Sequence, residues 1–73
     1  MRAEPSSQIS IVVNGEPAST GAATLAVLIA ELGYDPASVA TAVNGDFVPR
    51  AARGEQKIAP GDAIEVVAPR QGG

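Results

Sequence analysis

The chain has 73 residues, which is enough for one small domain and too few for an enzyme with a deep pocket. Histidine, cysteine and tryptophan are absent, which excludes imidazole acid–base chemistry, thiol nucleophiles, disulfides and the usual ligand sets of transition metals. The formal net charge is −3, with one basic and five acidic residues before position 50 and four basic and three acidic residues from there on, so nucleic-acid binding is not expected.

The first element that the sequence predicts is a β-hairpin. Residues 8–13 (QISIVV) alternate between two faces with the period of a half-buried strand. Asn14-Gly15 follows, and because an Asn-Gly pair accepts positive φ at both turn positions, it predicts a type I′ turn and a returning strand over residues 16–20. Pro17 cannot donate to a strand ladder, so this second strand is weak or lies at an edge.

A short helix is predicted next. Thr24 is a suitable N-cap, and Gly33 is expected to end the helix in the left-handed conformation. Asp35-Pro36 prevents the helix from continuing beyond that point. A helix of about two and a half turns is unstable alone and must be held against a sheet. The large apolar residues recur at i, i+3, i+4 and i+7 on one stripe, namely Leu25, Leu28, Ile29 and Leu32.

The second half of the chain predicts another hairpin and a final strand. Residues 38–43 are rich in alanine and β-branched residues and end at a second Asn-Gly pair, which is followed by a short returning strand before Pro49. A short strand is predicted over residues 56–58. The turn signal at residues 60–62 (PGD) then leads into residues 63–67 (AIEVV), the predicted last strand.

These elements together predict an α+β fold. The first and last strands are both strongly apolar, so the economical arrangement places them side by side in the sheet centre, with the helix packed across one face. This is a β-grasp, or ubiquitin-like, roll with a mixed sheet of about five strands. We expect the β-grasp domain to cover residues 8–68, after a disordered N-terminal extension at residues 1–7 and before a flexible tail at residues 69–73.

The tail is the candidate functional site. Residues 69–73 contain no apolar side chain that would anchor them, and extended they reach about 16 Å. Glycines have no Cβ, so Gly72-Gly73 would let the terminal carboxylate enter a narrow channel of another protein. A carboxylate becomes reactive toward nucleophiles once it forms a mixed anhydride with AMP. Such a chain would be the substrate of an activating enzyme. From composition alone, two terminal glycines are more often a simple disordered end, and the predicted fold is what favours the functional interpretation.

Taken in order, the motifs resemble the ThiS family of sulfur-carrier proteins of thiamin biosynthesis, within the MoaD/ThiS superfamily. The resemblance covers nearly all of residues 9–73. Each segment is weak alone, whereas their order and spacing are specific. The matching segments are 13–16 (VNGE), 24–33, 39–45, 47–50 (FVPR), 60–67 and 72–73.

The resemblance implies a two-step activation of the chain. An E1-like adenylyltransferase, ThiF in that pathway, would use ATP and Mg²⁺ to convert the Gly73 carboxylate to an acyl-adenylate. A sulfur donor fed by a cysteine desulfurase would displace AMP and leave a thiocarboxylate, which thiazole synthase (ThiG) would consume. The chain would then be a protein co-substrate with no bound cofactor and no catalytic residue of its own. Gly72 would be the slim neighbour of Gly73, and Arg70 and Gln71 match the variable part of the family tail.

Other residues have two interpretations each. The basic residues of the second half form either a basic partner surface or part of a solvated face of mixed charge, namely Arg50, Arg53, Lys57 and Arg70. Phe47 is either an exposed interface anchor or, as the sequence favours, a core residue. Asp62 is interpreted as a turn residue bonded to nearby backbone, and no spacing of acidic residues predicts a metal site.

Two further functions compete with a thiamin carrier. One is the same chemistry in another pathway, as in the MoaD-like small subunit of molybdopterin synthase or a carrier for cysteine synthesis. The other is a ubiquitin-like interaction module that never reacts, which the loss of Gly73 would leave functional. No apolar run approaches the roughly 20 residues of a membrane span and residues 1–7 do not read as a signal peptide, so we expect a cytoplasmic protein without membrane contact.

Overall fold

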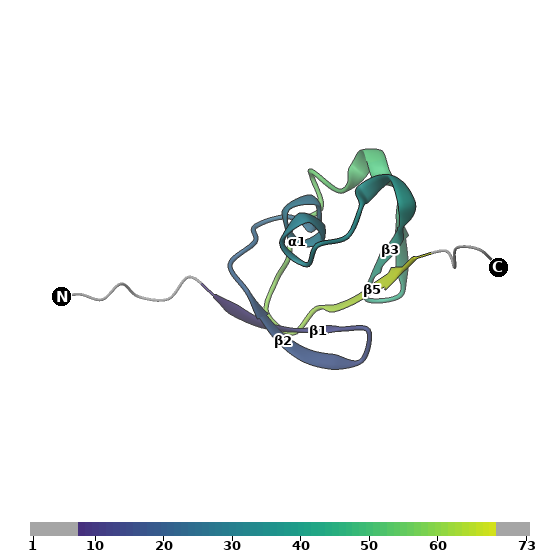
Figure 1. Ribbon diagram of the computed structural model, residues 1–73. Coiled ribbons are helices and arrows are strands. Elements are labelled where there is room, and N and C mark those ends of the chain that lie inside the picture. The colour runs from purple at the N-terminus through teal and green to yellow at the C-terminus, as the bar shows by residue number, and fades with distance from the viewer. Residues whose placement is uncertain (1–7, 69–73) are drawn as a thin grey trace.

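The computed structural model describes residues 8–68 and shows one mixed sheet with an α-helix lying across it (Figure 1). The predicted N-terminal extension and C-terminal tail lie outside the described residues. The strands are β1 (Ile9–Val13), β2 (Glu16–Thr20), β3 (Ala40–Val43), β4 (Asp46–Val48) and β5 (Ala63–Val67), the α-helix is α1 (Leu25–Glu31), and two 3-10 helices are η1 (Pro36–Ser38) and η2 (Arg50–Ala52).

The strand order is β2-β1-β5-β3-β4, so β5 is the central strand. β1 and β5 run parallel, and all other neighbouring pairs are antiparallel. The first and last strands therefore lie side by side, as predicted, and the predicted β-grasp fold is confirmed. β2 is an edge strand, which agrees with Pro17, whose Cα is paired with that of Val12.

Both Asn-Gly pairs form the predicted turns. Asn14 and Asn44 have φ values of 51° and 53°, and Gly15 and Gly45 have φ values of 83° and 87°. Positive φ at both central residues is the signature of the type I′ turn, whose twist matches that of the two strands it joins.

Two strand predictions differ from the structure. The predicted short strand at residues 56–58 is absent, because Lys57 makes only an isolated β-bridge with Thr24, the residue that precedes α1. The predicted strand over residues 38–43 begins later, at Ala40, because Pro36–Ser38 forms η1. Asp35 caps that 3-10 helix by accepting a hydrogen bond from the N–H of Ala37 at 3.0 Å.

The helix buries one face against the sheet. Thr24 caps it, and its hydroxyl accepts a hydrogen bond from the N–H of Val27. The predicted stripe is correct except at Leu32, which follows the last helical residue and is 41% exposed. No helix within residues 8–68 has the length and apolar character to cross a membrane. The core consists of Ile11, Ala22, Leu25, Leu28, Ile29, Val43, Val48, Ile64 and Val66.

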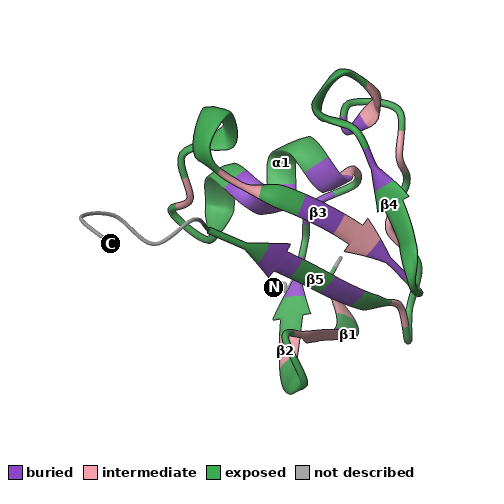
Figure 2. Cartoon of the chain, turned by 90° about the vertical axis from the view of Figure 1, so that its right-hand side faces the viewer, coloured by how far each residue is buried: buried purple, intermediate pink, exposed green. Residues whose placement is uncertain are grey.

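Burial alternates along the central strand. Ile64 and Val66 of β5 are buried beneath α1, whereas Glu65 and Val67 are exposed on the opposite face (Figure 2). The sheet thus has an inner face covered by the helix and an outer face open to solvent among the described residues.

Gly33 follows the helix with a φ of 86°, in the region that side chains rarely adopt. We expect Gly33→Ala to lower the free energy of unfolding by about 1 kcal/mol, because an alanine there is strained in the left-handed conformation. Thermal unfolding, monitored by circular dichroism, measures this loss of stability. Gly54→Ala is the matched control, since Gly54 does not have the left-handed φ and no atom lies within 4 Å of an added Cβ. Equal losses in the two variants would contradict this account.

Candidate functional site

The carboxyl end of β5 is the point from which the chain continues toward its closing glycines. Val66 is buried and Val67 is 64% exposed, and the Cα of Val67 is paired with that of Ala40 in β3. Figure 2 shows the end of β5 beside the beginning of β3. The predicted site residues Arg70, Gln71, Gly72 and Gly73 lie outside the described residues, which end at Ala68. The structure therefore locates the origin of the tail.

An open depression of about 440 Å³ lies beside this point. Its lining side chains are small or apolar, and none of them is an acid, a base or a metal ligand. The depression can therefore receive an apolar group of a partner, but it cannot perform chemistry. It is lined by Ala37, Ser38, Val39, Ala40 and Val67.

Asp35 orders the segment that forms one wall of the depression. Its two carboxylate oxygens accept hydrogen bonds from the N–H of Ala37 and from the hydroxyl of Ser38, both at 3.0 Å. The bond from Ala37, then the bond from Ser38 and the charge of Arg50, lower the pKa of Asp35 below its ordinary value. Asp35 thus remains a charged acceptor at neutral pH and holds η1 in place.

Arg53 supports the same segment from inside the protein, and the prediction that it belongs to a partner surface is wrong. Its side chain is only 3% exposed. The guanidinium donates from Nε to Thr41 Oγ1 at 3.0 Å, from Nη1 to the carbonyl of Pro36 at 2.9 Å and from Nη2 to the carbonyl of Val39 at 2.6 Å. A planar fork of donors suits three acceptors that diverge in this way. Arg53 is therefore a structural residue.

Phe47 shows the opposite error. The sequence favoured core packing, but the ring is 68% exposed. Its neighbour Val48 is buried, and since side chains alternate along a strand, Phe47 points to the outer face. On that face the strand register places Phe47 beside Ala42, and Ala42 beside Glu65. Arg50 is exposed as well, so these two residues of the predicted partner surface are accessible, and their binding role remains a prediction.

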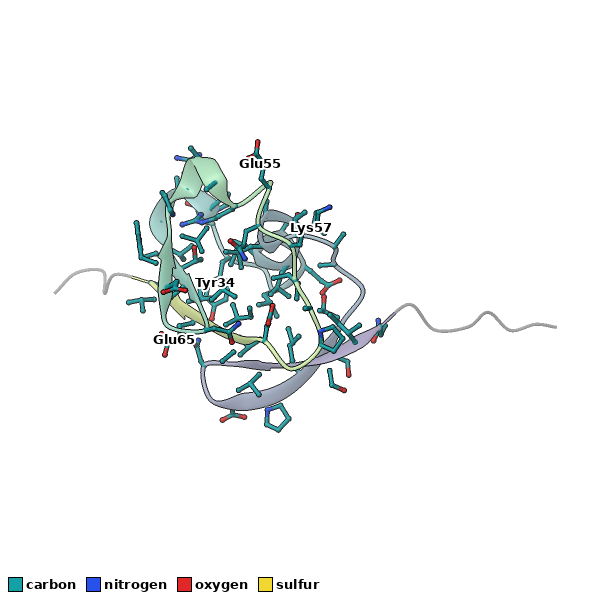
Figure 3. All side chains as sticks on the ribbon, turned by 180° about the vertical axis from the view of Figure 1, so that it is seen from behind. Tyr34, Glu55, Lys57 and Glu65 are labelled. Atoms are coloured by element: carbon teal, nitrogen blue, oxygen red, sulfur yellow. The ribbon has the colours of Figure 1, made fainter. Side chains whose placement is uncertain are left out.

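The basic residues within residues 8–68 do not form the single basic surface that was one interpretation of the sequence. Arg53 is buried, and Lys57 lies with Glu55 on the connection after η2, whereas Glu65 is on β5 (Figure 3). Asp62 is the turn residue that was predicted, because its Oδ2 accepts a hydrogen bond from the N–H of Ala59 at 2.9 Å. Among the described residues no group of three or more acidic side chains is arranged to hold a metal ion.

The sequence pattern of the ThiS family matches residues 11–73 of the chain. The chain belongs to the ThiS family. A crystal structure of the thiamine biosynthesis protein ThiS from Geobacter metallireducens is similar to it, with a TM-score of 0.74 and 28% sequence identity over 89% of this chain and 100% of that one. An NMR solution structure of a thiamine biosynthesis protein from the same bacterium has a TM-score of 0.75 and 28% identity, over 89% and 88% of the two chains. No curated protein matches the chain in sequence.

The sequence did not predict the apolar surface at the carboxyl end of β5. Residues 37–40 and Val67 carry small or apolar side chains, and such residues produce no motif. Their proximity arises from the antiparallel pairing of β3 with β5, which joins positions 27 residues apart, as in the pair Ala40 and Val67. Knowing that the last strand pairs with residues 38–43 would have indicated this surface.

Proposed function

We propose that this chain is a sulfur-carrier protein of thiamin biosynthesis and that the carboxylate of Gly73 carries the sulfur. The observation that carries the proposal is that the family match extends to Gly73 itself. It is supported by the absence of cysteine from the sequence, since no side chain is then available to hold sulfur as a persulfide. The similar Geobacter metallireducens structures belong to thiamine biosynthesis proteins.

The first proposed step is adenylation by an E1-like, ThiF-like enzyme. A carboxylate oxygen of Gly73 attacks the α-phosphorus of ATP, pyrophosphate leaves, and an acyl-adenylate forms. ATP and Mg²⁺ belong to the enzyme, where the metal neutralises the charge of the phosphates. Gly72 and Gly73 lack side chains, so the reacting group reaches an enclosed site without a steric obstacle, while Arg70 and Gln71 occupy the channel leading to it.

The second proposed step replaces oxygen by sulfur. Sulfur from a cysteine desulfurase, reduced to the sulfide level by its donor system, attacks the carbonyl carbon of Gly73 and AMP leaves. The resulting thiocarboxylate is the form that a thiazole synthase, ThiG-like, consumes. The chain is thus a co-substrate of two enzymes and not a catalyst, and we expect it to meet both of them in the cytoplasm.

A chain-dependent release of pyrophosphate tests the proposal. The E1-like adenylyltransferase of the same organism is incubated with ATP and Mg²⁺, with and without this chain. We expect saturable release that depends on the chain and ends with one pyrophosphate per chain when the adenylate accumulates. No release, with an enzyme that adenylates another carrier under the same conditions, would refute the proposed function.

The partner surface surrounds the end of β5 and extends over the outer face of the sheet. An enzyme that admits residues 69–73 must cover Val67 and the depression beside it, because β5 continues directly into those residues. Phe47 is the largest exposed hydrophobic side chain on the same outer face. Aromatic side chains are frequent hot spots at the centres of protein interfaces.

We expect Phe47→Ala to raise the Kd for the adenylyltransferase about tenfold or more while the thermal midpoint changes little, because the exposed ring contributes to binding and not to the core. Isothermal titration calorimetry gives the affinity. Val27→Ala is the matched control, since Val27 is 52% exposed on α1, on the other side of the sheet. A Kd equal to that of the Val27 variant would show that the outer face is not the docking surface.

A further inference from the structure

The side chain of Asn14 continues the central part of the sheet beyond the end of β1. The main chain of Asn14 turns away with a φ of 51°, and its N–H donates to the carbonyl of Ile64 at 2.8 Å. Its side-chain Oδ1 then accepts a hydrogen bond from the N–H of Val66 at 2.8 Å, and its Nδ2 donates to the carbonyl of Val66 at 3.2 Å. One side chain therefore binds both main-chain groups of Val66, which is 52 residues away.

This pairing replaces a strand residue that β1 does not have. The parallel register of β1 and β5 contains only two Cα pairs, Val12 with Ala63 and Val13 with Ile64. The next step of the ladder needs a donor and an acceptor opposite Val66. A primary amide has the same donor and acceptor as a peptide unit, so Asn14 supplies that step. On its other side, Val66 is paired with Thr41 of β3, and β5 is therefore held on both sides as far as Val66.

We propose that Asn14 is a positioning residue for the reaction at Gly73, an inference that rests on the proposed function. Residues 67–73, which follow Val66, span about 23 Å when extended. A small change in the direction of the chain at Val66 therefore becomes a larger displacement of the reacting carboxylate. With the Asn14–Val66 pair in place, the chain leaves the sheet from a fixed point and in a fixed direction. Without it, β3 alone holds the end of β5, and the partner must order that end during binding.

The other Asn-Gly turn provides a matched control. Asn44 has nearly the same φ, 53°, and its side chain binds the opposite end of β5. Its Oδ1 accepts a hydrogen bond from the N–H of Ala63 at 2.9 Å, and its Nδ2 donates to the carboxylate of Asp62 at 3.0 Å. Both asparagines thus fasten the central strand, but only Asn14 does so where the chain departs toward Gly73.

The test compares Asn14→Gly with Asn44→Gly. Glycine accepts the positive φ of both turns, so each variant removes a side-chain amide and keeps the turn. We expect Asn14→Gly to speed hydrogen exchange at the N–H of Val66, and Asn44→Gly to speed it at the N–H of Ala63. In adenylation by the E1-like enzyme, Asn14→Gly should raise KM about fivefold and leave kcat within about twofold, because the tail is ordered once it is bound. Asn44→Gly should leave both constants within about twofold.

The wild-type chain separates failure of this inference from failure of the proposed function. If the wild-type chain is not adenylated, the proposed function fails. If it is adenylated and the two variants have the same KM, Asn14 has only a structural role and the positioning proposal is overturned.

A second variant covers the case in which Asn14→Gly does not fold at the assay temperature. Asn14→Asp keeps the acceptor for the N–H of Val66 and places a carboxylate opposite its carbonyl, where the amide had donated. We expect this variant also to raise KM, by about threefold, with kcat near that of the wild-type chain. A wild-type KM in the folded Asn14→Asp chain would overturn the proposal.

Discussion

Deletion of Gly73 is expected to reduce kcat/KM for adenylation at least about 100-fold, because misplacing a reacting group by even 1 Å costs about that factor. The deletion moves the terminal carboxylate back by one residue, about 3.5 Å along an extended chain. The thermal midpoint should not change, since the core lies entirely within residues 11–66. Pyrophosphate release with the E1-like enzyme measures the loss.

Three further variants make this result specific to the position of the carboxylate. One extra residue after Gly73 should be as inactive as the deletion, and Gly73→Ala should also be strongly impaired because its Cβ occupies space in a narrow channel. Val27→Ala is the control that preserves both the length and the two glycines at an exposed position of α1, and we expect its kcat/KM within about twofold of the wild-type value. Normal adenylation of the deletion variant would mean that Gly73 is not the reacting residue.

Arg53→Ala is expected to have the largest effect on stability. It leaves the buried hydroxyl of Thr41 and the part-buried carbonyls of Pro36 and Val39 without the donor that they have in the wild-type chain. Each buried polar group left unsatisfied costs about 1–3 kcal/mol, so we expect a loss of about 3 kcal/mol in the free energy of unfolding. A domain of this size has a total stability of about 3–5 kcal/mol, so the variant should keep only about 0–2 kcal/mol and unfold at a much lower temperature than the wild-type chain. Circular dichroism during heating reports the midpoint.

Arg50→Ala is the matched control for this loss. Arg50 begins η2, three residues before Arg53, and its side chain is exposed, so its removal should change the free energy of unfolding by less than about 0.5 kcal/mol. Arg53→Lys should lie between the two, because an ammonium group cannot reach three divergent acceptors as a guanidinium does. A wild-type midpoint for Arg53→Ala would return Arg53 to the partner surface that the sequence suggested.

Most of the fold was predictable because its turns and its helix are determined by residues that are close together in the sequence. The type I′ turns follow from Asn-Gly pairs, and the buried helix face follows from the spacing of Leu25, Leu28 and Ile29. The strand predicted at residues 56–58 failed because its pairing partner is a single residue, Thr24, which no local pattern reveals.

The candidate site was less predictable because two of its residues depart from the usual burial of their residue type. Arginine is usually exposed and phenylalanine usually buried, yet Arg53 is 3% exposed and Phe47 is 68% exposed. Partners distant in sequence decide both cases and also the role of Asn14, whose amide binds a residue of the last strand. Gly73 was singled out by the resemblance to the ThiS family and by its position beside Gly72 in the sequence.

Intact mass spectrometry of the chain is the most direct test of the central claim. The chain is incubated with ATP, Mg²⁺ and the E1-like enzyme of its own organism, and then with a cysteine desulfurase, cysteine and a reductant; the chain lacking Gly73 is the control. We predict a mass gain of one adenylyl group, followed by a product in which one oxygen of the original chain is replaced by sulfur, with neither change in the control. An unchanged mass, with an enzyme that adenylates another carrier in parallel, would contradict the proposal that Gly73 carries sulfur.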